Sequence, residues 1–260
     1  MPLSKRMEKN LSLMLPCACA ADIGCDHGFV SIELIRRGIC EHVIAADVRS
    51  GPLGRAREHI RKAGLEDRIE ARISDGFEAF AEGEIRSALI AGMGGALMQR
   101  ILTKGRNIVS GLDYLVLQPQ SELEEFRVFL RENHLAEDRS ETAFEDGKEY
   151  LAIRVLPAED VENAVLTDGS TRRNRIERLE KLLGEEAGAA GLLADRYGAD
   201  LLLEDRGLSV FLQREEIRLE NVISQLRSQR SVREDRVEEF MERCRMNRLA
   251  QHVLEVTNGV

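Results

Sequence analysis

Five short apolar runs, separated by segments of helical spacing, recur through the first part of the chain and constrain its fold more than any other feature. The runs lie at 18–23, 42–48, 69–73, 87–91 and 114–118. Because they show little polar alternation, they predict strands buried on both faces, as in parallel sheets covered by helices. The pattern therefore predicts an α/β fold with a Rossmann-like sheet.

The segments between these runs predict the covering helices. Helical spacing occurs at 30–37, 52–64, 96–102 and 121–133. Ser121 is expected to be the N-cap of the last of these helices. A further strand is predicted at 149–156, and the stretch 135–148 before it suits an antiparallel hairpin at the end of the sheet.

The chain changes character after Pro157. An acidic and polar stretch at 158–170 predicts a linker, and only helical spacing follows it. Two long antiparallel helices are expected, with a break near 228–231. We therefore predict a domain at 1–157 and an all-helical domain at 158–260.

Composition excludes several classes of protein. The 260 residues are 43% hydrophobic, which suffices for a buried core. The 37 Lys and Arg against 46 Asp and Glu give a net charge of −9, which argues against coating nucleic acid by bulk charge. No window approaches the roughly 20 apolar residues of a membrane helix. Five cysteines without framework or zinc-ligand spacing predict free thiols. We expect a soluble, cytoplasmic protein without a metal, and find no signal for its oligomeric state.

Acidic residues follow three of the predicted strands, at the edge where such sheets bind ligands. Asp22 opens the motif DIGCDHG at 22–28, where a carboxylate disfavours a pyrophosphate but suits a cationic amine. Asp47 can accept hydrogen bonds from both ribose hydroxyls. Asp75 and Gly76 can meet the amine of adenine. Each feature alone also fits an ordinary turn, but together they favour an adenosyl ligand with few phosphates.

Glycines follow the fourth strand, in the run Gly92, Met93, Gly94 and Gly95. They leave room for a methyl donor and an acceptor to meet, although a flexible loop would look the same. The run 118–120 (QPQ) after the fifth strand would wall the same crevice. Neither a Ser/His/Asp order nor a metal-ligand cluster stands out.

Basic residues gather in three places. Each group fits either a solvated helix face or a surface for the RNA backbone. The groups are Lys5, Arg6 and Lys9; Arg172, Arg173, Arg175 and Arg178; and Arg227, Arg230, Arg233 and Arg236.

Taken together, these motifs resemble the TrmK family, the bacterial tRNA (adenine-22-N1)-methyltransferases. The resemblance covers residues 3–157 and rests on LSKR, ADIGCDHG, ADVRSGP, SDG, IAGMGG, LQPQ and DGKEY in that order. It implies a class I methyltransferase domain, S-adenosylmethionine as cofactor, tRNA as partner and a coiled-coil-like helical domain that binds tRNA.

The resemblance also implies roles for individual residues. The cofactor-binding set is Asp22, Gly24, Asp26, His27, Asp47, Asp75, Gly76 and Gly92. The set beside the transferring methyl group is Gly92, Met93, Gly94, Gln118 and Pro119. Three features depart from the family pattern. Asp47 stands where Glu is common, Gln120 stands where Asn is usual, and 158–196 reads as an insertion.

The implied chemistry needs little from the protein beyond alignment. Adenine N1 has an in-plane lone pair that can attack a sulfonium methyl group, so no general base is required. Alignment alone can lower a barrier by roughly 7–11 kcal/mol. The adenine must be presented unpaired, because N1 lies on its pairing edge. Two alternatives remain: a methyltransferase acting on rRNA, protein or a small molecule, and a non-catalytic RNA-binding scaffold. A nicotinamide dehydrogenase is disfavoured, because its phosphate-cradling glycine spacing is absent.

Overall fold

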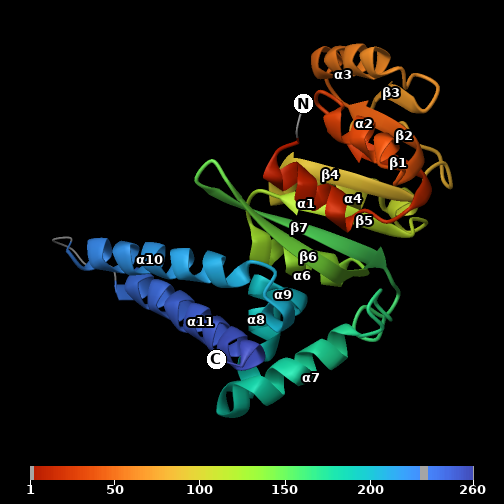
Figure 1. Cartoon of the computed structure of the whole chain (residues 1–260). Helices are drawn as coiled ribbons and strands as arrows, with labels where there is room; N and C mark the ends of the chain where they lie inside the picture. Colours follow the sequence, from red (N-terminus) through yellow and green to blue (C-terminus); the bar gives the residue numbers. More distant parts are fainter. Residues whose placement is uncertain (1–2, 229–233, 260) are drawn as a thin grey trace. The chain divides into compact units, whose positions relative to one another are not determined.

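The computed structural model describes residues 3–228 and 234–259, and the chain divides into two compact units, residues 1–169 and 170–260 (Figure 1). The first unit contains one seven-stranded sheet in the order β3-β2-β1-β4-β5-β7-β6. Its strands are β1 (Cys17–Ile23), β2 (Cys40–Asp47), β3 (Ile69–Ile73), β4 (Ser87–Met93), β5 (Tyr114–Pro119), β6 (Leu135–Glu145) and β7 (Lys148–Pro157). The predicted Rossmann-like class is confirmed.

The sheet is parallel from β3 to β5, and β7 runs antiparallel to both β5 and β6. The predicted terminal hairpin is therefore confirmed. The order reverses between β1 and β4, so their carboxyl ends diverge into a crevice. Ala88, Leu89 and Val116 are fully buried in the central strands, as strands covered on both faces require.

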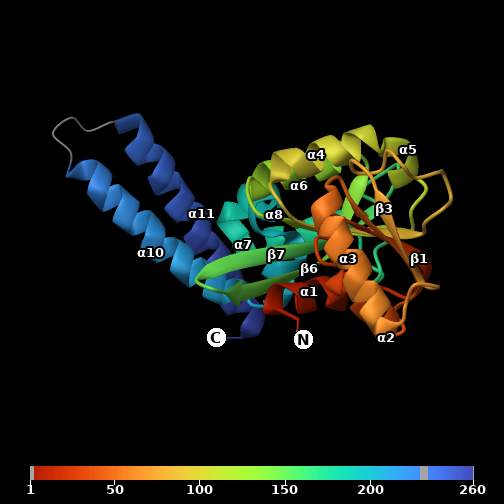
Figure 2. The same cartoon turned by 90° about the horizontal axis from the view of Figure 1, so that it is seen from above.

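Helices cover both faces of this sheet. Figure 2 shows α4, α5 and α6 on one side and α1, α2 and α3 on the other. Their bounds are α1 (Lys5–Leu13), α2 (Phe29–Arg36), α3 (Ser50–Ala63), α4 (Gly95–Lys104), α5 (Arg106–Val109) and α6 (Leu123–Glu132). Leu11, Ile32 and Leu53 from the second group pack into one core cluster with the sheet.

One predicted helix start is wrong. Helix α6 has Glu122 as its N-cap, with φ +57°, and not Ser121. The hydroxyl of Ser121 instead accepts from the N–H of Gly95 at 3.3 Å, and the Glu122 carboxylate accepts from the N–H of Ala96 at 2.9 Å. Both side chains thus cap the neighbouring helix α4, which local sequence does not reveal.

The second unit is all helical within the described residues, as predicted. Its elements are α7 (Arg172–Leu183), the 3-10 helix η1 (Gly184–Ala189), α8 (Ala190–Tyr197), α9 (Ala199–Glu204), α10 (Leu208–Arg227) and α11 (Glu234–Asn258). Helices α10 and α11 lie antiparallel (Figure 1), with Asn247 donating to the carbonyl of Leu212 at 3.0 Å. Helix α10 ends where the break was predicted, and 229–231 of that break lie outside the described residues.

The stretch after Pro157 packs against the sheet instead of serving as a free linker. Val161 and Leu166 are buried with Ala136 of β6 in a small apolar cluster. The compact units consequently divide at 169/170, later than the expected domain boundary at 157/158.

A buried ion pair ties this stretch to the sheet. Arg154 of β7 donates to Asp138 of β6 at 2.5 Å and to the hydroxyl of Thr167 at 2.9 Å. The N–H of Thr167 donates to Asp138 at 2.7 Å. Side-chain exposure is 6% for Arg154 and 0% for Asp138, so neither charge has water as a substitute partner.

We predict that Arg154→Met lowers the free energy of unfolding by about 3–5 kcal/mol, because it leaves the buried carboxylate of Asp138 without a positive partner. Urea denaturation measures this loss. Arg86→Met is the matched control, since Arg86 and Asp113 are paired but half exposed, and it should cost under about 1 kcal/mol. Equal losses in the two variants would contradict the anchoring role of Arg154.

Candidate functional site

The crevice at the carboxyl ends of the parallel strands opens into a cavity of about 460 Å³. Its lining residues come from β1, β2 and β4, from the turns after β1, β2 and β3, and from helices α1, α2 and α4. The predicted site residues that line it are Asp22, Gly24, Asp26, Asp47, Asp75, Gly76, Gly92 and Met93. Residues as far as 71 positions apart in the sequence are thus brought to one place.

Asp22 is a deeply buried acid of the cavity, with 5% of its surface exposed. Its carboxylate accepts a hydrogen bond from the hydroxyl of Ser31 in α2 at 2.6 Å. Burial, the opposing effect of Ser31 and a smaller contribution from the negative charge of Asp47 together raise the pKa of Asp22 to about 6. A cation entering the cavity would favour the ionised form.

Asp47 ends β2 and is also 5% exposed. One carboxylate oxygen accepts from the N–H of Arg49 at 2.8 Å, which fixes the side chain at the cavity edge. The Arg49 guanidinium lies 3.6 Å from the same oxygen but is 70% exposed, so the ion pair is weak. A fixed, buried carboxylate at this strand end suits a ligand that donates hydrogen bonds.

Glycine is required at two points of the cavity wall. Gly24 has φ +77°, and a Cβ atom there would lie 2.3 Å from the methyl carbon of Met93. Gly76 has φ +59°, and a Cβ atom there would lie 2.8 Å from Ile101. The backbone can therefore approach a ligand closely only without a side chain.

The turn before helix α2 borders the cavity, but not all of its residues line the cavity. His27 is the one predicted cofactor residue outside the lining. Its ring stacks on Phe29 at 5.7 Å, and its carbonyl accepts a hydrogen bond from Nδ1 of His59 at 2.9 Å. In this structure His27 therefore shapes the loop beside the cavity.

The residues predicted beside the methyl group separate into two sets. Gly92 and Met93 line the cavity, whereas Gly94 is the N-cap of α4 and Pro119 is buried at the end of β5. Gln118 is fully buried and faces α1. Its amide donates to Oδ1 of Asn10 at 2.8 Å and to the carbonyl of Arg6 at 3.3 Å.

Helix α1 supplies cavity residues that sequence reasoning did not place at this site. Arg6, Met7 and Asn10 line the cavity. The Arg6 guanidinium donates to Oε1 of Gln118 at 3.3 Å, lies over the ring of Tyr150 at 5.6 Å and is 3.6 Å from where a Cβ atom of Gly92 would be. The spacing of Arg6 and Asn10, one helical turn apart, was the signal that could have revealed this face.

The basic groups are largely engaged with acidic or aromatic neighbours. Lys9 pairs with Glu141 at 2.7 Å, Arg172 pairs with Asp195 at 3.0 Å, and Arg236 lies over the ring of Phe240. Arg230 and Arg233 lie outside the described residues. Arg173 and Arg178 of α7 are exposed.

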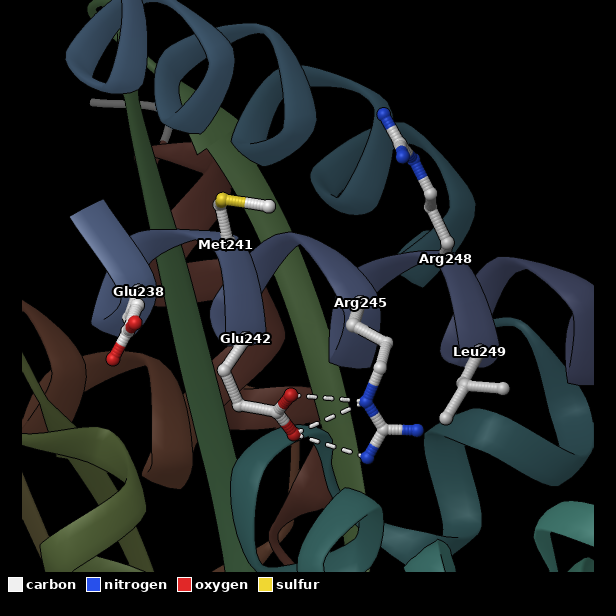
Figure 3. A pocket seen from close by; sticks show the side chains of 6 residues that line it. All are labelled: Glu238, Met241, Glu242, Arg245, Arg248 and Leu249. Carbon is white, nitrogen blue, oxygen red and sulfur yellow. Dashed lines mark hydrogen bonds and ion pairs between the residues drawn. The ribbon is translucent and has the colours of Figure 1, made fainter. Parts of the chain in front are cut away.

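A second hollow of about 530 Å³ lies along one face of α11 (Figure 3). Its lining residues are Glu238, Met241, Glu242, Arg245, Arg248 and Leu249. All of them come from one helix, and Arg245 donates to Glu242 at 2.9 Å. Although it is the larger hollow, its side chains do not converge on a common point, so we place the functional site at the strand ends.

Neither a metal centre nor a membrane span appears in the described part of the chain. Residues 3–228 and 234–259 contain no group of three or more His, Cys, Asp or Glu side chains able to hold a metal ion. No described helix has the length and apolarity needed to cross a membrane.

The sheet order and its strand-end cavity define a class I methyltransferase. A family described as "Methyltransferase domain" matches residues 3–153. The tRNA (adenine(22)-N(1))-methyltransferase of Bacillus subtilis is 34% identical over 167 residues, covering 64% of this chain and 69% of that protein. A putative tRNA methyltransferase of Mycoplasma pneumoniae is 33% identical over 150 residues, covering 56% and 67%.

Solved structures have a similar fold over nearly the whole length of this chain. The B. subtilis m1A22 tRNA methyltransferase TrmK is 25% identical, with TM-score 0.75 over 96% of this chain and 99% of that one. An uncharacterized protein of Listeria monocytogenes is 25% identical, with TM-score 0.77 over 97% and 100%. This chain belongs to the TrmK family of methyltransferases.

We predict that Gln118→Leu loosens α1, because it leaves the buried Oδ1 of Asn10 without its donor. The free energy of unfolding should fall by about 1–3 kcal/mol, and hydrogen exchange of the α1 amides should accelerate. Gln120→Leu, at an exposed neighbouring position, is the control. Unchanged exchange in Gln118→Leu would show that α1 is held by other contacts.

Proposed function

We propose that this chain transfers the methyl group of S-adenosylmethionine to N1 of adenine 22 in tRNA. The observation that carries the proposal is one cavity whose lining brings Asp22, Asp47 and Asp75 together with Gly92 and Met93. Membership of the TrmK family supports the choice of acceptor.

The cavity fits the cofactor at both ends. A methionine group carries a cationic amine and a carboxylate, and Asp22 and Arg6 in the lining offer the complementary charges. Asp47 would accept from the ribose hydroxyls, and the turn at Asp75 and Gly76 would meet the adenine. When bound, S-adenosylmethionine supplies an electrophilic methyl group on a sulfonium. These assignments explain why three acids stand where a phosphate ligand would require N–H donors.

The acceptor side is the region around Gly92. The missing side chain leaves space there, and Nε2 of Gln120 is 3.8 Å from where a Cβ atom would be. Gln118 would act as a positioning residue, since it holds Arg6 and the rest of α1 against this side. Because adenine N1 needs no base to attack, these residues would contribute by alignment and by excluding water.

We infer that the helical unit binds the tRNA body. Exposed Arg173 and Arg178 on α7 offer charges for phosphate contacts. The pairing of Arg172 with Asp195 reduces the basic surface, so any such contact would be local and not bulk attraction.

The deciding experiment uses unmodified tRNA transcripts with adenine or guanine at position 22. Methylation mapped by mass spectrometry should appear at N1 of adenine 22 and vanish in the guanine transcript. Asp47→Ala should abolish it, whereas Asp67→Ala, an exposed acid outside the cavity, should not. Methylation that survives the guanine substitution would indicate another acceptor. RNA binding without cofactor binding would indicate a scaffold.

We predict that cofactor affinity falls on acidification. In the free protein the pKa of Asp22 is raised to about 6, so below pH 6 the proton competes with the cationic amine. Binding should weaken by up to about tenfold per pH unit there and level off above pH 7. The same raised pKa makes ionised Asp22 a cost to folding above pH 6, and this cost disappears as the pH falls.

Calorimetry of S-adenosylmethionine binding between pH 5 and 8 measures this effect. Asp22→Asn should bind more weakly at pH 7.5 and show a flatter profile, which separates Asp22 from other titrating groups. A wild-type affinity that is constant from pH 5 to 7 would remove Asp22 from contact with the amine.

A further inference from the structure

Two cysteines lie side by side at the amino ends of the parallel strands, the end of the sheet opposite the cavity. Cys17 begins β1 and Cys40 begins β2, and the two residues are register partners on adjacent parallel strands. Their sulfur atoms lie 3.2 Å apart. All five cysteines of the chain are free thiols, and the proposed methyl transfer uses none of them.

The surroundings make the two thiols unequal. Cys17 is half-buried, whereas Cys40 is only 2% exposed. The Cys17 sulfur also lies 3.2 Å from the hydroxyl of Ser87 on β4. The Cys40 S–H and the Ser87 O–H can therefore both donate to one partly accessible sulfur.

These donors stabilise the Cys17 thiolate. The hydrogen bond from Cys40 lowers the pKa of Cys17, and the hydroxyl of Ser87 adds to this against the opposing effect of burial. The same bond raises the pKa of Cys40. Burial raises the pKa of Cys19, Cys25 and Cys244. Since the thiolate is the attacking species, Cys17 is the nucleophile among the five.

A shared metal does not explain the pair. Zinc takes four ligands in structural sites and three in catalytic sites. No third His, Cys, Asp or Glu joins these two sulfurs in a ligand-like group within the described residues.

We propose that Cys17 and Cys40 form a reversible disulfide by exchange with low-molecular-weight disulfides. The Cys17 thiolate attacks one sulfur of the small disulfide, which forms a mixed disulfide and releases one small thiolate. The Cys40 thiol loses its proton to solvent and attacks the Cys17 sulfur, which releases the second small thiolate. The two protein thiols are oxidised, and the small disulfide is reduced to two thiols.

The strand geometry permits this bond. Neighbouring strands lie about 4.7–4.9 Å apart, within the roughly 4.4–6.8 Å between Cα atoms that a disulfide spans. The sulfurs must approach from 3.2 Å to about 2.0 Å. Cys19 is paired in register with His42 and not with Cys40, so it is not expected to compete.

The test exposes the reduced full-length chain to excess oxidised glutathione and maps the products by mass spectrometry without reduction. We expect the peptides of Cys17 and Cys40 to become linked, with loss of two free thiols and full recovery in dithiothreitol. Because the bond forms at the far edge of the sheet, S-adenosylmethionine affinity should change less than about twofold. Neither the disulfide mapping nor the affinity measurement depends on whether the proposed methyl transfer occurs.

Three variants separate the roles of the thiols. Cys40→Ser should stop at a glutathione adduct on Cys17, and Cys17→Ser should form neither adduct nor bond at this edge. Cys19→Ser is the matched control and should behave as the wild type. A wild-type chain that keeps a stable adduct on Cys17, links other cysteines, or reacts only after unfolding would overturn the proposal, and that result needs no variant to fold.

Discussion

The structure depends on a carboxylate that is buried where the strand order reverses. Asp22 is almost fully removed from water and lies near the negative charge of Asp47 at the end of the next strand. Among the residues that the structure describes, only the hydroxyl of Ser31 is a side-chain hydrogen-bond partner of Asp22. Burying a charge in this way is costly. A fold that keeps such a group at the mouth of a cavity gains ligand binding in exchange for stability, because a cationic ligand supplies the missing partner.

The rest of the first unit holds that cavity in shape. Glycines at Gly24 and Gly76 let the backbone approach a ligand, and Gln118 fastens helix α1 by bonds to Asn10 and Arg6. Arg6 thereby carries a positive charge to the side of the cavity near Gly92. The site therefore has a floor made by strand ends and a wall, helix α1, that the buried amide of Gln118 helps to hold.

Local patterns predicted the strands, the terminal hairpin and the strand-end acids, because buried strands and their carboxyl ends leave a direct mark in the sequence. Contacts between segments that are distant in the sequence leave no such mark. The bond between Gln118 and Arg6 joins residues 112 apart, and Ser121 caps α4 instead of its own helix. Likewise, the polar composition of 158–170 gave no sign that Val161 and Leu166 are buried, because their burial depends on contact with β6.

The central claim is that this cavity selects a positively charged adenosyl ligand over a pyrophosphate. Calorimetry of the full-length chain with S-adenosylmethionine and, separately, with NAD⁺ tests it most directly. The account predicts saturable binding of S-adenosylmethionine and no measurable heat of binding for the dinucleotide at the same concentrations. Binding of NAD⁺ with equal or greater affinity would contradict it.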